Sequence, residues 1–125
     1  MNSRLILAIV TTIGLITAGG EMAATEKLSL HVTPNVSSAP STVIVKATVA
    51  KDSDNRWLTI EADSGSFYRS SAIQLDGDKA PTVTEIRLSN LPSGQYGVSA
   101  VLRNSLGEEI TVRRTMIVLS RFGEP

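Results

Sequence analysis

The stretch Leu91–Val98, "LPSGQYGV", decides the fold of this chain. It lies between two runs in which apolar residues alternate with polar or small ones, first Thr84, Ile86 and Leu88, then Val98, Ala100 and Leu102. Alternation with a period of two is typical of a strand that buries one face. Proline and glycine between the runs predict a tight turn. We therefore expect two neighbouring strands, with Tyr96 at the start of the second.

The same alternation extends outward over the chain. It predicts seven strands, at residues 28–33, 42–50, 56–63, 67–75, 82–88, 96–103 and 109–119, and a loop at 33–41. In the last strand the apolar positions change parity between Val112 and Ile117, which predicts a β-bulge at Arg113-Arg114. Short strands joined by Gly, Pro, Asn and Asp turns predict an all-β fold, a seven-stranded antiparallel β-sandwich.

The N-terminal segment has the layout of a secretory signal. Arg4 precedes an uncharged apolar run, Leu5–Ala18, and small residues follow at Gly19 and Gly20. We expect a signal-peptide helix over 1–20 cleaved after Gly20, a linker over 21–27, the sandwich over 28–120 and a polar tail over 121–125. An uncleaved anchor is the alternative, although the run is shorter than the roughly 20 residues of a spanning helix. Cleavage predicts an extracytoplasmic protein, periplasmic or secreted, with no stable membrane span.

Composition excludes several classes of function. The 125 residues include 12 basic and 12 acidic side chains, one histidine and no cysteine. A neutral chain without a basic run gives no reason to expect nucleic acid as a partner. The absence of cysteine excludes disulfides and thiolate metal sites. His31 is predicted to be a solvated residue on the polar face of a strand, without a nucleophile and orienting group beside it, so we expect no enzyme activity.

The segment Gly94–Val98 resembles the G-x-Y-x-C stretch of immunoglobulin-type domains, with Val98 at the position of the second cysteine. Trp57 and Val45 likewise resemble the conserved tryptophan and first cysteine of that family. The chain is thus similar to cysteine-free immunoglobulin-like or fibronectin III-like domains of bacterial secreted proteins. The resemblance implies a tyrosine corner formed by Tyr96 with Leu91 and Gly94. One feature departs from it, since alternation with Leu58 requires either a bulge before Leu58 or a partly exposed Trp57.

Acidic residues gather in three loops, at 51–56, 76–81 and 103–109. If the strands run up and down, these loops emerge at the same end of the sandwich and bring together Asp52, Asp54, Asp76, Asp78, Glu108 and Glu109. Carboxylate oxygens in such numbers are suited to calcium. The other interpretation is that these residues serve turn geometry, with nearby lysine and arginine side chains offsetting their charge.

Exposed aromatic and arginine side chains dominate the energetics of interfaces, which makes Trp57, Tyr68 and Arg69 candidate partner-binding residues. Tyr68-Arg69 is expected in a strand at a sheet edge. We therefore expect an exported, non-catalytic binding or structural module of the cell envelope, with an envelope or extracellular protein as partner. An edge strand, 109–119, would pair with a strand of that partner. The alternative is a module that binds a glycan or calcium through the three loops or the Trp57 face.

Overall fold

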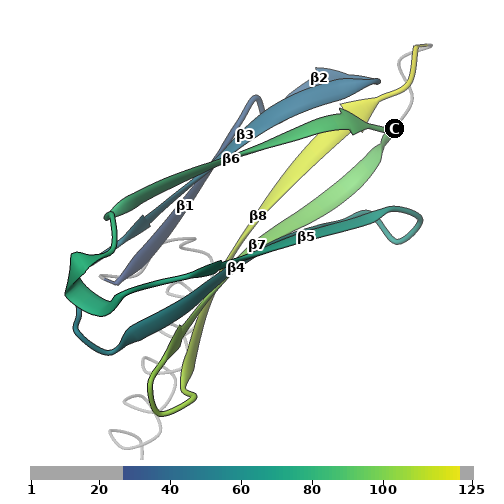
Figure 1. Ribbon diagram of the computed structural model, residues 1–125. Coiled ribbons are helices and arrows are strands. Elements are labelled where there is room, and N and C mark those ends of the chain that lie inside the picture. Colours follow the sequence, from purple (N-terminus) through teal and green to yellow (C-terminus); the bar gives the residue numbers. More distant parts are fainter. Residues whose placement is uncertain (1–26, 122–125) are drawn as a thin grey trace, which may run out of the picture.

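A computed structural model describes residues 27–121 and shows two β-sheets packed against each other (Figure 1). Its elements are β1 (Leu28–Thr33), β2 (Val36–Ser38), β3 (Ser41–Val49), β4 (Asn55–Asp63), β5 (Tyr68–Gln74), the 3₁₀ turn η1 (Gly77–Lys79), β6 (Val83–Leu91), β7 (Gly94–Asn104) and β8 (Glu109–Leu119). One sheet has the order β1-β3-β6 and the other β2-β8-β7-β4-β5. The predicted all-β sandwich is confirmed, whereas the signal-peptide helix lies outside the described residues.

The described part of the chain contains eight strands, so the prediction of seven is wrong. The additional strand, β2, lies in the stretch predicted as a loop and pairs in parallel with Ile117–Leu119, so the prediction of an antiparallel sandwich is also wrong at this edge. Backbone bonds at its two ends hold it: the Ile117 N–H donates to the Asn35 carbonyl at 2.8 Å, and the Ala39 N–H donates to the Leu119 carbonyl at 2.7 Å. Its side chains are mostly exposed, so it has no alternating pattern that a sequence could show.

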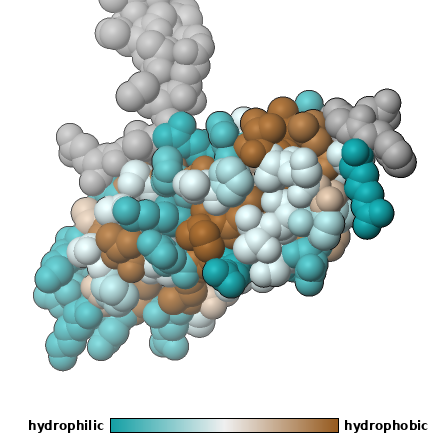
Figure 2. All heavy atoms as spheres, turned by 90° about the horizontal axis from the view of Figure 1, so that it is seen from above, coloured by the Kyte–Doolittle hydropathy of each residue, from teal (hydrophilic) through white to brown (hydrophobic). Residues whose placement is uncertain are grey.

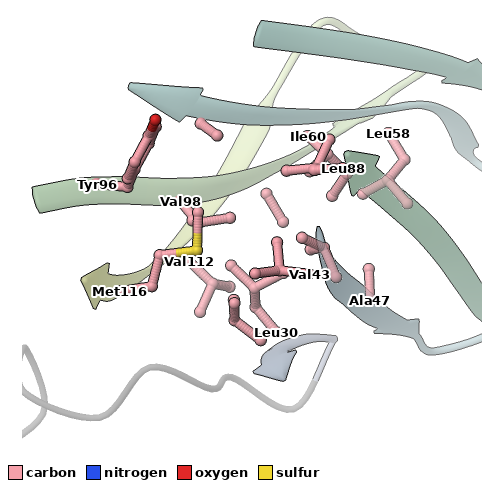
Figure 3. Close-up of a cluster of buried hydrophobic side chains, with 14 of the residues drawn as sticks. Leu30, Val43, Ala47, Leu58, Ile60, Leu88, Tyr96, Val98, Val112 and Met116 are labelled. Carbon is pink, nitrogen blue, oxygen red and sulfur yellow. The ribbon is translucent and has the colours of Figure 1, made fainter. Parts of the chain in front are cut away.

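Inward-facing residues of both sheets form one hydrophobic core (Figure 3). In β3 every second residue is buried, from Ser41 to Val49, and β4 buries Leu58, Ile60 and Ala62 in the same way. The positions that resemble the two family cysteines, Val45 and Val98, are fully buried. Burying an aliphatic side chain of this size stabilises the fold by roughly 1.5–3 kcal/mol, so the core can replace a disulfide.

The bulge predicted at Arg113-Arg114 is wrong, because β7 and β8 pair in unbroken register from Gly94↔Val118 to Arg103↔Glu109. Val112 and Met116 are both buried, so Arg114 occupies an inward position between them. Its side chain leaves the core at the edge of the sandwich, where Nε donates to the Leu30 carbonyl of β1 at 3.0 Å. Arg114 thus links the edge of the five-stranded sheet to the edge of the three-stranded sheet.

Candidate functional site: the outer face of the five-stranded sheet

Tyr96 forms the expected corner. Its hydroxyl donates to the Pro92 carbonyl at 2.7 Å, and the ring is buried at the end of the core, with the hydroxyl at the ring's far end in Figure 3. The ring also meets Phe67 edge-on at 6.4 Å between centroids. Burial raises the pKa of the Tyr96 hydroxyl. Leu91 is fully buried, and Gly94 has a φ of 157° with the Ser64 side chain 3.1 Å from where a Cβ would lie. These residues are therefore structural.

The three acidic loops do lie at one end of the sandwich, at the lower left of Figure 1. The Ser105 N–H of the β7–β8 loop donates to the Asp54 carbonyl of the β3–β4 loop at 2.8 Å. On the other side of that loop, the Ser53 carbonyl lies so close to Gly77 that a Cβ there would be 2.8 Å away. A hollow of about 570 Å³ between the β3–β4 and β5–β6 loops is lined by Ser53, Arg56, Gln74, Leu75, Asp76, Gly77, Asp78 and Lys79.

The acids of these loops do not converge on one point. Asp52 is paired with the Lys27 ammonium, and this hydrogen bond holds the pKa of the Asp52 carboxyl below its usual value. Its other oxygen accepts the Asp54 N–H at 2.9 Å, which is the turn geometry considered above. Glu108 accepts a hydrogen bond from the Asn104 amide at 2.9 Å. Between residues 27 and 121, no three histidine or acidic side chains are grouped to hold a metal ion. In this part of the chain the acidic loops therefore show no ready-made group of three carboxylates.

Trp57 satisfies both of the alternatives left open by its sequence position. The register of β4 against β7 shifts between Asn55 and Trp57, and the Trp57 side chain faces outward with 42% of its surface exposed. A shallow hollow beside it is lined by Arg56, Arg103, Asn104, Ser105 and Gly107. A large apolar ring is unfavourably exposed to water at the surface. Because this ring is not part of the core, it is available to a ligand or partner.

Tyr68 and Arg69 do not form one patch, because neighbours in a strand face opposite sides of the sheet. Tyr68 lies on the outer face, 57% exposed, and its hydroxyl donates to Glu61 Oε2 at 2.7 Å, which raises the Tyr68 pKa. Arg69 turns inward: Nη1 donates to the Ser89 carbonyl of β6 at 2.8 Å, and the guanidinium lies 5.3 Å from the centre of the Phe67 ring. Arg69 therefore links the two sheets at the opposite side of the sandwich, between β5 and β6.

The outer face of the five-stranded sheet carries mostly short side chains between its two aromatic residues. One row across it consists of Ala72, Thr59, Val101 and Thr111, and the next of Ser70, Glu61, Ser99 and Arg113. Trp57 stands at one end of the face and Tyr68, opposite Asp63, at the other. Six residues of β4 separate these ends, which corresponds to about 20 Å.

Gly97 opens a hollow in this face that sequence reasoning missed. A Cβ at Gly97 would meet nothing within 4 Å, so the close packing of the fold does not require glycine there. The hollow, about 460 Å³, is lined by Asn35, Val36, Gln95, Tyr96, Gly97, Thr115, Met116 and Ile117. A glycine inside a strand weakens it and often marks a close approach by a ligand or another backbone. This was the one signal in the sequence that could have located the hollow.

Other parts of the surface carry fewer features that suggest a binding site. Seen from above, apolar side chains appear as separate patches between polar ones (Figure 2). His31 is exposed on β1, as expected. Over the described range 27–121, no helix is long and apolar enough to cross a membrane.

Comparison with known proteins shows the fold but no family. No protein-family model and no curated protein sequence matches the chain. Among solved structures, it is similar to a superoxide reductase (neelaredoxin) from Ignicoccus hospitalis, at 16% identity and a TM-score of 0.60, over 75% of this chain and 81% of that one. It is also similar to a superoxide reductase (neelaredoxin) from Archaeoglobus fulgidus, at 12% identity and 0.54, over 77% and 93%. The soluble domain of PmoD from Methylocystis gives 11% and 0.52, over 76% and 94%.

Reduction of superoxide, the reaction in the name of two of these structures, transfers single electrons and relies on a redox-active group such as a metal centre or a flavin. Non-haem redox metals are held chiefly by histidine and cysteine, with carboxylates beside them. The entire sequence has one histidine and no cysteine, and His31 lies exposed on β1 and belongs to no group of three acidic or histidine side chains within residues 27–121. The residues of this chain thus do not fit an imidazole- or thiolate-rich centre.

Proposed function

We propose that this chain is an exported, immunoglobulin-like binding module that recognises a protein partner through the outer face of its five-stranded sheet. The exposure of Trp57 carries the proposal. Alternation along β4 turns this large ring away from the core, and no strand of the described chain covers it. Aromatic side chains of this kind contribute disproportionately to protein interfaces.

The rest of the face suits a protein partner. Short side chains between Trp57 and Tyr68 let a partner approach the sheet closely, while Glu61 and Arg113 supply both signs of charge for a polar rim. Non-catalytic action is part of the proposal, supported by the position of the chain's single histidine, His31, which is exposed on β1. Export rests on the N-terminal segment, and mass spectrometry of the protein recovered outside the cytoplasm is expected to show a chain that begins at Glu21.

The test is capture followed by titration. The protein, expressed from its full-length sequence in its host, is crosslinked in the extracytoplasmic fraction, and the captured partner is then purified and titrated. W57A is expected to weaken binding by about 2 kcal/mol, roughly 30-fold. The matched control is V83A, because Val83 is an exposed apolar residue, 43% exposed, on the other sheet. A partner whose affinity is the same for W57A and V83A would refute this use of the face.

A glycan is the second candidate, favoured by two exposed aromatic rings, Trp57 and Tyr68, on one face of the sheet. Aromatic rings stack on the apolar faces of sugars, and the hollow beside Trp57 is lined by arginine, asparagine and serine side chains that could bond hydroxyl groups. Isothermal titration with soluble envelope glycans distinguishes the two. Saturable glycan binding that W57A abolishes would replace the protein partner by a sugar.

A further inference from the structure

Within residues 27–121, β5 is the outer strand of the five-stranded sheet, with β4 as its one neighbour there. This confirms the expectation that Tyr68-Arg69 lies in an edge strand. The strand predicted to pair with a partner, β8, is second from the opposite edge, where β2 covers its last residues. β5, rather than β8, is therefore an edge strand along its whole length.

The direction of the backbone groups in β5 follows from two hydrogen bonds at its ends. The Leu75 N–H donates to the Arg56 carbonyl at 2.7 Å, and the Ser64 N–H donates to the Phe67 carbonyl at 3.0 Å. In an antiparallel pair, residues alternate between bonding the neighbouring strand and facing away from it. Odd-numbered residues of β5 therefore bond β4. The N–H and C=O groups of the even-numbered residues, Tyr68, Ser70, Ala72 and Gln74, point out of the sheet edge.

This edge has few of the features that protect sheet edges from pairing, which are proline, charge and bulges. From Phe67 to Leu75 the sequence "FYRSSAIQL" contains no proline or glycine and one charge. That charge, Arg69, reaches away from the edge to the Ser89 carbonyl. The facing edge strand, β6, differs, because it carries Glu85 and Arg87 and its Ser89 carbonyl is occupied by Arg69.

We propose that two copies of this chain pair through β5, antiparallel, around a two-fold axis at Ser71. In this register Tyr68 lies opposite Gln74 of the partner subunit, and Ser70 lies opposite Ala72 of the partner subunit. All four outward-pointing residues of each copy then exchange hydrogen bonds, roughly eight in total. The two five-stranded sheets become one continuous sheet.

The strand is complementary to itself in side chains as well as in backbone groups, as a two-fold interface requires. Ser71 lies opposite Ser71 of the partner subunit, so two small side chains meet on the axis. Arg69 lies opposite Ile73 of the partner subunit, so the two Arg69 side chains of the dimer do not face each other. Pairing of one seven-residue strand buries less surface than a standard interface, so the dimer is a weak one that forms at high protein concentration.

A single cysteine tests the register directly, because the chain contains none of its own. On the axis, Ser71 and its counterpart form a non-hydrogen-bonded pair with Cα atoms about 4.5 Å apart, which a disulfide can span. Under mild oxidation of the protein expressed from its full-length sequence, S71C is expected to give several-fold more disulfide dimer than S66C. Ser66 is an exposed residue in the β4–β5 turn, so S66C measures chance collisions.

Sedimentation of the protein without cysteine provides the second measurement. The wild-type chain is expected to show a concentration-dependent dimer that A72P abolishes, because Ala72 directs its N–H out of the edge and proline removes that donor without breaking the bonds to β4. A72V keeps the N–H and is expected to keep the dimer. Equal crosslinking of S71C and S66C, a wild-type chain that stays monomeric at all concentrations, or a dimer that A72P leaves intact would each overturn the proposal. None of these results depends on Trp57, so the proposed function is tested separately.

Discussion

Replacing Tyr96 by phenylalanine removes one hydroxyl and keeps the ring. The hydroxyl donates to the Pro92 carbonyl at 2.7 Å, while the ring remains against Phe67. A single hydrogen bond contributes about 1 kcal/mol net, so the free energy of unfolding of Y96F is expected to fall by that amount. With a urea m-value of about 2 kcal/mol/M, the midpoint moves by about 0.5 M.

The same variant has a distinct pH dependence. Because burial raises the pKa of Tyr96 in the folded chain, its contribution is complete below the unfolded value near 10 and is lost as the pH rises through the folded-state pKa. The difference between wild type and Y96F is therefore expected to shrink in alkaline solution. Y68F is the matched control, since the Tyr68 hydroxyl bonds Glu61 at the surface, and its midpoint should stay unchanged at neutral pH. If Y96F unfolds at the wild-type urea concentration, Tyr96 does not pin the corner.

Three further outcomes are expected. R69M and R114M each lose a hydrogen bond from a guanidinium that links the two sheets, so chemical denaturation should show each variant to be about 1 kcal/mol less stable. A variant with wild-type stability would contradict this linking role of its arginine. G97A is expected to be about 0.5 kcal/mol more stable, because nothing occupies the Cβ position, and a loss of stability would mean that the fold itself needs this glycine. The Lys27–Asp52 pair lowers the Asp52 pKa, so its stabilisation is present above pH 4 and is lost as the pH falls further. The gap in melting temperature between wild type and D52N should therefore close in acid, and a constant gap would exclude the pair as its source.

Strands with one buried face could be predicted from the sequence because burial and side-chain identity agree along them. β3 is the clearest instance, with Val43, Val45, Ala47 and Val49 all buried and Thr42, Lys46 and Thr48 exposed. The tyrosine corner was predictable for a related reason, since its bond joins residues four apart in the chain. Both features depend on residues that are close together in the sequence.

The features that were missed depend on contacts between distant residues. β2 exists because Asn35 and Ala39 meet the backbone of β8, about eighty residues away, and three exposed side chains cannot signal that pairing. In β8 the predicted change of parity came from Ile117, an apolar residue on the outer face between the buried Met116 and Val118. An arginine can occupy an inward position when its long stem follows the sheet and its charged end finds a carbonyl at the edge.

The candidate site shows the same division. Alternation placed Trp57 outward, and chain order placed the acidic loops at one end, but composition could not tell which carboxylates face each other. Asp52 pairs with Lys27, which lies outside the three loops and twenty-five residues away in the chain. A count of acids in loops therefore does not give their partners, because each acid also has nearby cations and backbone donors with which it can bond.

In the described part of the chain the two sheets have four edge strands, β1, β6, β2 and β5, which differ in how open they are to pairing with another strand. Arg114 ties β8 to β1, Arg69 occupies the edge of β6, and β2 is only three residues long. β5 alone combines length, small side chains and outward-pointing backbone groups, and it borders the face that carries Trp57. Pairing of two copies along β5 would place two such faces on one continuous sheet. A partner that presents two binding sites would then be held with an avidity well above the affinity of one face, even if each contact is weak.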